Sequence, residues 1–311
     1  MFHEHCQVRS AVATLKNSVI GSQKQKDHII EHGVLARLIH LLVDPEMSST
    51  VKTDVVYILG SILNGSETSI KSLNEADLVT ILLQGVVSAT EPKLVTACLW
   101  CLQSMFLAKT PLFSDHESTE TIPGQCQVIY ADPATVPHLV SLLTAASATA
   151  PHQIAVCTIL SCCCRATDQQ NLLVSAGLLA ALTATLTSHV TSVQLSGLQC
   201  LAAVVYNNVA AGTALTTTSY QGKALLSLAT HFTGRENNVD IQLAAGRVLT
   251  YLYRAEVLPG PDTDSVVTYR VLPCLVRMCK KEETTNNRIT AAETLAYLIE
   301  VRINQTQCLF S

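Results

Sequence analysis

Three consecutive cysteines, Cys162, Cys163 and Cys164, are the residues whose type and spacing first suggest chemistry. Thiolates can bind zinc, form disulfides or act as nucleophiles. Cys98 and Cys101 form a CxxC motif, which in a thioredoxin-like site would follow a strand and open a helix. Which of these roles is possible depends on the secondary structure that holds the thiols.

A helical pattern recurs along the chain and includes both cysteine motifs. Each copy has small residues, then a central leucine, then apolar residues three and four positions later, which form one face of an α-helix. The copies are TDVVYILGSIL (53–63), VTACLWCLQSMF (95–106), AVCTILSCCC (155–164), LSGLQCLAAVV (195–205), LAAGRVLTYLY (243–253) and ITAAETLAYLI (289–299). The central leucines are Leu15, from an earlier copy, and Leu59, Leu102, Leu160, Leu201, Leu249 and Leu295.

A second apolar helix is predicted before most copies of this helix, and a short polar helix often precedes it. The second helices are predicted at 33–42, 77–87, 135–143, 177–186, 222–232 and 271–279. Gly33, Gly177 and Gly222 stand where the chain must turn sharply. The central leucines lie 41–48 residues apart, except for one gap of 58. This arrangement is typical of armadillo and HEAT repeats.

The sequence therefore predicts an all-α fold, an armadillo/HEAT-type α-solenoid of about six to seven repeats of 41–48 residues. The solenoid is expected to fill residues 1–300, and a short non-repeat tail to follow at 301–311. The wide gap contains residues 109–133, whose Pro, Gly, Ser and acidic residues predict an exposed loop inserted in the solenoid.

The repeat register explains the cysteines as packing residues. Cys163 and Cys164 fall three and four positions after a central leucine, where the other copies carry apolar core residues. Successive helix residues point about 100° apart, so three neighbours cannot close on one zinc ion. Cys162 falls on the side that faces away from the core, where it could be exposed and modified. Cys98 and Cys101 also fall at packing positions.

The residues do not predict catalysis or a bound cofactor. The sequence has no Walker loop and no GxGxxG, GxSxG or HExxH motif, and its ten histidines have no acidic partner at fixed spacing. HEHC, at residues 3–6, is one short cluster and does not fix a tetrahedral metal site. We therefore expect a protein that is not an enzyme and holds neither a metal ion nor a cofactor.

Composition narrows the kinds of partner. Charged residues make up 14% of the 311 residues, and none occurs from Gln169 to Gly222. The low charge suggests that partners cover part of the surface, although a large buried fraction would give the same value. The net charge of −4 does not indicate nucleic acid or an anionic membrane as a partner. The N-terminus lacks a signal-peptide pattern, so the twelve cysteines are expected to be reduced.

Partner binding is expected on the helices that carry the central leucines. In an armadillo solenoid, the residues two before and two after each such leucine stack on one helix face and point into a concave groove. The predicted partner-binding residues at these positions are Tyr57, Trp100, Ser104, Gln199, Arg247, Tyr251, Glu293 and Tyr297. A ladder of Trp and Asn, as in nuclear-import adaptors, is missing, since only Trp100 and Asn17 match it. Arg247 alone does not make the basic groove of a catenin-like adaptor.

Several segments resemble the N-terminal half of the armadillo repeat-containing protein 8 family. They are LKNSVIGSQKQK (15–26), LGSILNGSE (59–67), KSL (71–73), ACLWCL (97–102), ATVPHLVSLL (134–143), LPCLVRMC (272–279) and AETLAYLIE (292–300). The last two are the most specific. The resemblance runs from about residue 7 to Glu300, where it stops, which suggests a truncated form of a longer repeat protein.

This resemblance implies a role that periodicity alone does not. The family is a non-catalytic scaffold subunit of the CTLH, or GID-type, E3 ubiquitin ligase, found in cytoplasm and nucleus. The chain would then dock CTLH-type scaffold subunits for ubiquitin-dependent protein degradation, whereas the substrate receptor would need later repeats absent from this sequence. The alternative is a cargo- or peptide-binding armadillo adaptor, importin-α-like or catenin-like. Neither function requires nucleic acid or a membrane.

Overall fold

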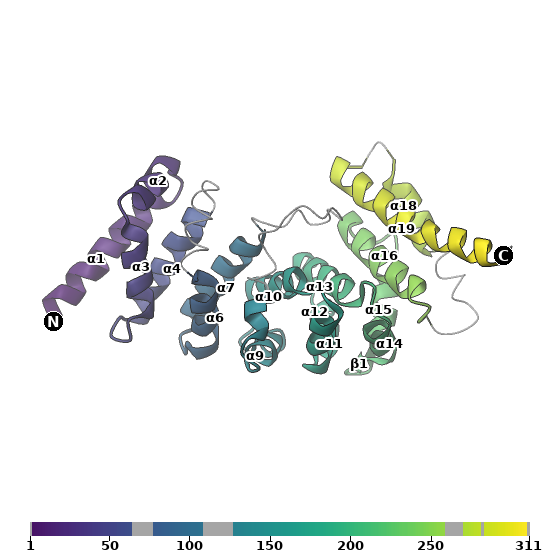
Figure 1. Ribbon diagram of the computed structural model, residues 1–311, viewed down its shortest axis with the longest axis horizontal. Coiled ribbons are helices and arrows are strands. Elements are labelled where there is room, and N and C mark those ends of the chain that lie inside the picture. The colour runs from purple at the N-terminus through teal and green to yellow at the C-terminus, as the bar shows by residue number, and fades with distance from the viewer. Residues whose placement is uncertain (1, 64–76, 108–126, 259–269, 281–282, 310–311) are drawn as a thin grey trace. The chain divides into compact units, whose positions relative to one another are not determined.

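The computed structural model describes residues 2–63, 77–107, 127–258, 270–280 and 283–309. Helices make up nearly all of the secondary structure in these ranges, which confirms the predicted all-α class (Figure 1). The chain forms two compact units, Met1–His138 and Leu139–Ser311. We call them unit 1 and unit 2.

Unit 1 is built on three long helices that carry central leucines: α1 (Phe2–Val19), α4 (Ser49–Leu63) and α7 (Pro92–Leu107). α4 packs against both α1 and α7. The shorter helices α2 (Gln23–Glu31), α3 (Val34–Val43) and α6 (Leu78–Ser88) complete the repeats. α3 lies against α4, and α6 lies against α7. A 3₁₀ turn, η1 (Val128–Tyr130), contacts α6. The helix that follows, α9 (Thr135–Ser141), contains the boundary between the two units.

Unit 2 repeats this arrangement with four long helices: α10 (Ala150–Cys163), α13 (Thr191–Val205), α16 (Val239–Arg254) and α19 (Thr285–Leu309). Each packs against the next in this order. The short helices are α11 (Thr167–Ser175), α12 (Leu178–Leu186), α14 (Val209–Thr217), α15 (Leu225–His231) and α18 (Leu272–Met278). α14 packs against α11, and α15 packs against α12, so each kind of helix stacks on its own kind.

The predicted central leucines form the core of both units. Leu59 and Leu102 in unit 1, and Leu160, Leu201 and Leu249 in unit 2, are fully buried. Complete burial of one such side chain stabilises a fold by about 1.5–3 kcal/mol. The central leucines of α1 and α19 are half-buried.

Turn residues fix where the second helices begin. Gly33 and Gly177 adopt left-handed backbone, with φ of 64° and 86°, immediately before α3 and α12. This conformation is disfavoured for residues that carry a Cβ atom, so both glycines are required by the turn, as predicted. The Asn208 side chain caps α14 by accepting a hydrogen bond from the Ala211 backbone N–H.

Three predicted boundaries differ from the structure. Gly222 is not at the start of a helix: it lies in a hairpin of β1 (Ser219–Tyr220) and β2 (Lys223–Ala224), and the helix starts at Leu225. The predicted exposed loop at 109–133 lies partly outside the described residues, but its end contains η1, where Ile129 is fully buried. Residues 301–309, predicted as a tail after the repeats, continue α19 as helix.

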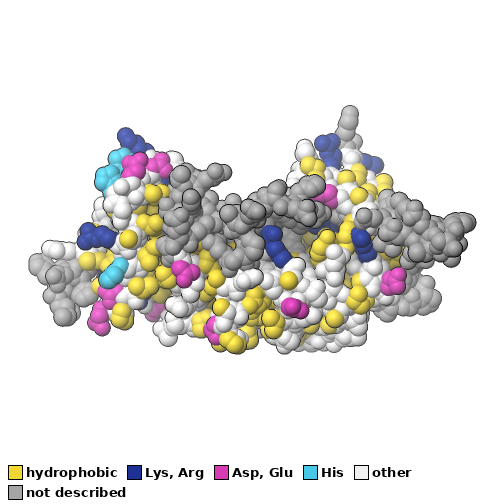
Figure 2. Space-filling view, viewed as in Figure 1, with side chains coloured by type: hydrophobic (Ala, Val, Ile, Leu, Met, Phe, Trp, Pro, Cys, Tyr) yellow, Lys and Arg dark blue, Asp and Glu magenta, His cyan; other side chains and the backbone are white. Residues whose placement is uncertain are grey.

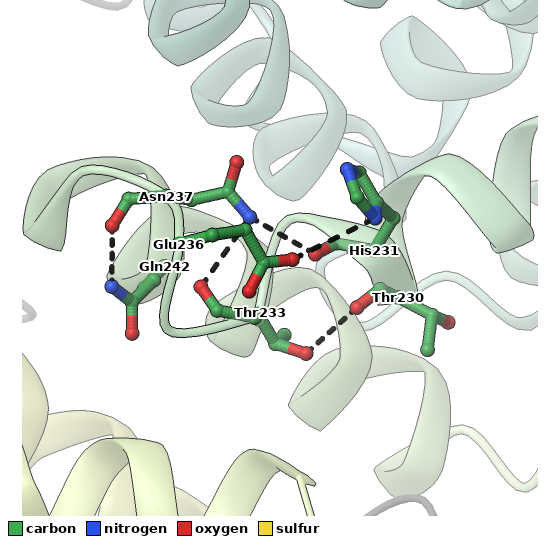
Figure 3. A network of polar contacts seen from close by, with 7 residues as sticks. Thr230, His231, Thr233, Glu236, Asn237 and Gln242 are labelled. Atoms are coloured by element: carbon green, nitrogen blue, oxygen red, sulfur yellow. Dashed lines mark hydrogen bonds and ion pairs between the residues drawn. The ribbon is translucent and has the colours of Figure 1, made fainter.

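A polar network fixes the connection between α15 and α16 (Figure 3). The Asn237 amide donates a hydrogen bond to the His231 carbonyl at 3.1 Å, and the Gln242 amide donates to the Asn237 carbonyl at 2.6 Å. Gln242 is only 3% exposed, and its side-chain oxygen accepts a hydrogen bond from Arg277 of α18. One buried glutamine therefore holds the loop before α16 and links that helix to α18.

Candidate partner-binding face

The thiols pack in the helix core, as the repeat register predicts for most of them. Cys98, Cys101, Cys163 and Cys164 are all buried. The prediction that Cys162 faces outward is wrong, because this residue is only 7% exposed. α13 packs along α10, and Cys200 of α13 lies near Cys162.

Burial suppresses the chemistry of these thiols. It raises the pKa of Cys98 to about 12 and that of Cys164 to about 12. The pKa of Cys200 is raised mainly by a hydrogen bond with Cys157 and, to a smaller extent, by burial. Because the thiolate is the form that attacks electrophiles and binds metals, these residues are unreactive near neutral pH. Within the part of the chain that the structure describes, no group of three or more His, Cys, Asp or Glu side chains could hold a metal ion.

We expect alkylation of the native protein to distinguish the exposed thiol of Cys279 from the buried thiols of the described residues. Cys279, just after α18, is exposed and serves as the internal control. Iodoacetamide at pH 8 should modify Cys279, while Cys98, Cys101 and Cys162–Cys164 stay unmodified until urea unfolds the chain. Raising the pH to 9 should not change this, since pKa values near 12 leave Cys98 and Cys164 protonated. Peptide mass spectrometry gives the result, and modification of Cys162–Cys164 at the rate of Cys279 would contradict it.

In unit 1, the predicted binding positions bring two aromatic rings together. Tyr57 on α4 and Trp100 on α7 are half-buried, and their ring centroids lie 5.6 Å apart. Gly60 of α4 lies against the indole, which leaves no room for a methyl group at that position. Ser104 is one turn further along α7, and its hydroxyl donates to the Trp100 carbonyl at 3.0 Å. This face therefore offers an aromatic pair with an uncharged polar neighbour.

In unit 2, the predicted positions lie on adjacent long helices and differ in exposure. Gln199 on α13 and Arg247 on α16 are half-buried, and Glu293 on α19 is exposed. Tyr251 on α16 is only 8% exposed, whereas Tyr297 on α19 is half-buried. Most of these side chains are thus at least partly exposed to solvent, whereas Tyr251 is surrounded mainly by other side chains.

The neighbours of Tyr251 form a compact aromatic group that we call the tyrosine cluster, consisting of Tyr206, Tyr251 and Tyr297. The Tyr206 and Tyr251 centroids lie 5.0 Å apart, and those of Tyr251 and Tyr297 lie 5.2 Å apart, both edge-to-face. The Tyr206 and Tyr297 rings lie 5.7 Å apart. Such edge-to-face pairs each contribute about 0.5–1.5 kcal/mol beyond their buried area. Through Tyr206 at the C-terminal end of α13, the cluster joins that helix to α16 and α19.

Two arginines lie at the cluster. The Arg247 guanidinium donates to the Tyr251 hydroxyl at 3.0 Å, with its central carbon 5.8 Å from the ring centroid. The Arg254 guanidinium lies 3.8 Å from the Tyr297 centroid and donates to the Tyr297 carbonyl at 3.4 Å. Cation–π contacts of this kind contribute about 0.5–2 kcal/mol, depending on solvation. The face therefore combines ordered aromatic and guanidinium groups, the side chains that dominate protein interfaces.

Sequence reasoning missed Tyr206 and Arg254, although a signal was present. Tyr206 is five residues after Leu201, and Arg254 is five residues after Leu249. This position is one helical turn beyond the groove positions considered, so it extends the same helix face toward the C-terminal end of each long helix.

On the face that Figure 2 draws, the described residues carry few charges. In Figure 2, hydrophobic and other uncharged atoms cover most of the coloured surface, and the charged side chains form separate small groups. No helix among the described residues is both long and apolar enough to cross a membrane. The arrangement has the composition of a contact surface, with few residues that could do acid–base chemistry.

Curated proteins named armadillo repeat-containing protein 8 are similar to most of this chain. The Mus musculus protein is 33% identical over 293 residues, covering 94% of this chain and 41% of its own length. The Xenopus laevis protein is 33% identical over 294 residues, covering 94% of this chain and 38% of its own length. The chain thus spans about two fifths of the length of these relatives. No protein-family model matches it.

Solved structures of designed armadillo proteins share the fold. One designed armadillo repeat protein has a TM-score of 0.62 at 14% identity, covering 85% of this chain and 99% of its own. Another, in complex with the peptide (KR)4, has a TM-score of 0.58 at 19% identity, covering 78% and 92%. At these identities the likeness concerns the fold alone. The chain therefore has the armadillo-repeat fold, and 94% of it is homologous to part of armadillo repeat-containing protein 8, in the N-terminal half of that protein.

Proposed function

We propose that this chain is a non-catalytic scaffold that binds protein partners through the long helices of its repeats. The observation that carries the proposal is the aromatic and guanidinium surface on those helices: Tyr57 with Trp100 in unit 1, and the tyrosine cluster with Arg247 in unit 2. Aromatic and arginine side chains supply most of the binding energy at protein interfaces. The inertness of the buried thiols supports a role without covalent chemistry.

The more specific proposal is a scaffold of a CTLH/GID-type E3 ubiquitin ligase, working in cytoplasm and nucleus. Its support is the homology to armadillo repeat-containing protein 8 over 94% of the chain. We propose that the chain docks the scaffold subunits of such a complex. Since it spans 41% of the mouse relative, we propose that the substrate receptor requires repeats outside the homologous part.

Affinity purification of the tagged chain from cell extract, followed by mass spectrometry, tests this function. We expect CTLH-type scaffold subunits among the captured proteins, and we expect a purified subunit to bind the purified chain directly. Importin-β or cadherin-like tails in their place would contradict the ligase role and favour an adaptor of the importin-α or catenin type. Tight binding of a purified substrate receptor to this chain would contradict the proposal that the receptor requires repeats outside the homologous part.

A matched pair of variants tests the binding face. Trp100→Ala should weaken binding of the captured subunit about 10- to 30-fold, because truncating a central interface aromatic costs about 1.4–2 kcal/mol or more. Leu172→Ala on α11 is the control, since Leu172 is an exposed apolar residue on a helix outside this face. Equal affinities for wild type and Trp100→Ala would place the interface elsewhere.

A further inference from the structure

The corner between α13 and α14 carries part of the binding face and needs external support. It consists of Tyr206, Asn207 and Asn208, and Tyr206 contributes one ring to the tyrosine cluster. Asn207 adopts left-handed backbone with φ of 51°. Asparagine adopts this conformation more readily than other residues with a Cβ atom, but the conformation still costs free energy, which surrounding contacts offset. The groups that hold this corner therefore decide where Tyr206 lies.

The main support is Gln170 on α11, which is only 2% exposed. Its side-chain nitrogen donates to the Ala203 carbonyl at 3.0 Å and to the Tyr206 carbonyl at 2.9 Å. These carbonyls belong to the C-terminal end of α13, where no later helical N–H is available as a donor. Gln170 thus closes the end of α13 from a neighbouring helix.

Asn208 completes this support and is also 2% exposed. Its side-chain nitrogen donates to the Gln170 oxygen at 2.9 Å and to the Asn171 oxygen at 3.0 Å. Its side-chain oxygen caps α14 through the Ala211 N–H at 3.0 Å. Gln170 and Asn208, which we call the amide pair, therefore satisfy each other in a stretch of sequence that contains no charged residue. A buried network of this kind is rigid because every lost bond leaves an unpaired polar group.

The opposite side of the same corner contacts the binding face. The Tyr297 hydroxyl of α19 donates to the Asn207 side-chain oxygen, and the Tyr206 ring lies 5.7 Å from that of Tyr297. Through three consecutive residues, the corner therefore connects α11 and α14 to α19. α19 is the second long helix after α13 in unit 2.

We infer that Gln170 and Asn208 are positioning residues for the binding face of unit 2, acting through the corner and the tyrosine cluster. The consequence for partner binding rests on the proposed function, whereas the coupling itself is a property of the chain. Loss of the amide pair releases the strained corner, withdraws Tyr206 from Tyr297 and loosens the cluster far from the substituted residue.

Hydrogen–deuterium exchange of the free protein tests the coupling. Gln170→Met keeps the size of the side chain but removes its donors and its acceptor. We expect amide exchange at least tenfold faster in residues 204–212 and also in α19 around Tyr297, which is linked to Gln170 through the corner. The matched control is Gln242→Met, which removes an equally buried amide from the same unit. It should accelerate exchange in residues 232–242 and in α18, but not around Tyr297.

A second variant distinguishes loss of the coupling from a general loss of stability. Asn207→Gly suits the left-handed backbone and removes only the side chain that accepts from Tyr297. It should accelerate exchange around Tyr297 while α11 keeps its protection. Acceleration confined to α11 and α14 in Gln170→Met, or an equal increase across unit 2 in both glutamine variants, would overturn the inference.

The binding assay separates this inference from the proposed function. If a captured scaffold subunit binds the wild type, Gln170→Met should weaken its binding more than Gln242→Met does, and equal affinities would contradict the positioning role. If that subunit does not bind the wild type, the proposed function fails, while the exchange data still decide the coupling.

Discussion

Replacing Tyr251 by alanine is expected to lower the free energy of unfolding by about 3–5 kcal/mol, the usual cost of truncating a buried aromatic residue. Tyr251 is nearly buried and touches both Tyr206 and Tyr297 at edge-to-face distances. Its removal leaves a cavity between α16 and the two neighbouring rings. Urea unfolding followed by circular dichroism measures the change.

Tyr251→Phe is the matched control. It keeps the ring contacts and removes only the hydroxyl that accepts from Arg247, so it should cost about 1 kcal/mol. A small effect of Tyr251→Ala, close to that of Tyr251→Phe, would mean that the cluster contributes little to folding. Tyr251 would then be better described as a binding residue, which was its role in the sequence-based prediction.

Gly60→Ala in unit 1 is expected to lower the free energy of unfolding by about 1–3 kcal/mol, the usual cost of overpacking. The added methyl carbon would lie 2.8 Å from Cη2 and 2.9 Å from Cε3 of Trp100, with Cζ3 closer still. The indole must therefore move outward. Trp100 is the only tryptophan of the chain, so a red shift of its fluorescence emission should report the displacement directly.

Gly246→Ala in α16 is the control for this substitution. There the nearest atom to the added methyl carbon is Leu275 Cδ2 at 3.5 Å, an ordinary van der Waals contact. Because alanine favours a helix by about 1 kcal/mol over glycine, this variant should be neutral or stabilising. Unchanged Trp100 emission and stability in Gly60→Ala would show that the indole does not pack on α4.

The sequence was sufficient for the helices and for most of the core, because both follow from local periodicity. Leu59, Leu102 and Leu201 recur with the same apolar neighbours, and a helical period places them on one buried face. Turns that require a glycine with left-handed backbone were also predictable, as at Gly33. The hairpin around Gly222 was not, since its glycine satisfies a strand turn as well as a helix start.

The side of a helix on which a residue lies could be predicted, but not what covers that side. Cys162 lies two residues after its leucine, on the side predicted to face outward, yet it is only 7% exposed. Tyr251 and Tyr297 were placed on the binding face, but their contact with Tyr206 depends on the distance between neighbouring helices. Gln170 gave no signal, because a glutamine in a polar helix looks like a surface residue until its partners are known.

Under the proposed ligase function, the uncharged helices α12, α13 and α14 have a further consequence. Ubiquitin is attached to lysine amino groups, and the sequence contains no lysine between Lys109 and Lys223. The interval spans α10 to α14 and includes the amide pair and Tyr206. A subunit built in this way offers no acceptor for self-modification along that part of its surface. Any ubiquitin attached to lysine within unit 2 must lie at Lys223 or beyond.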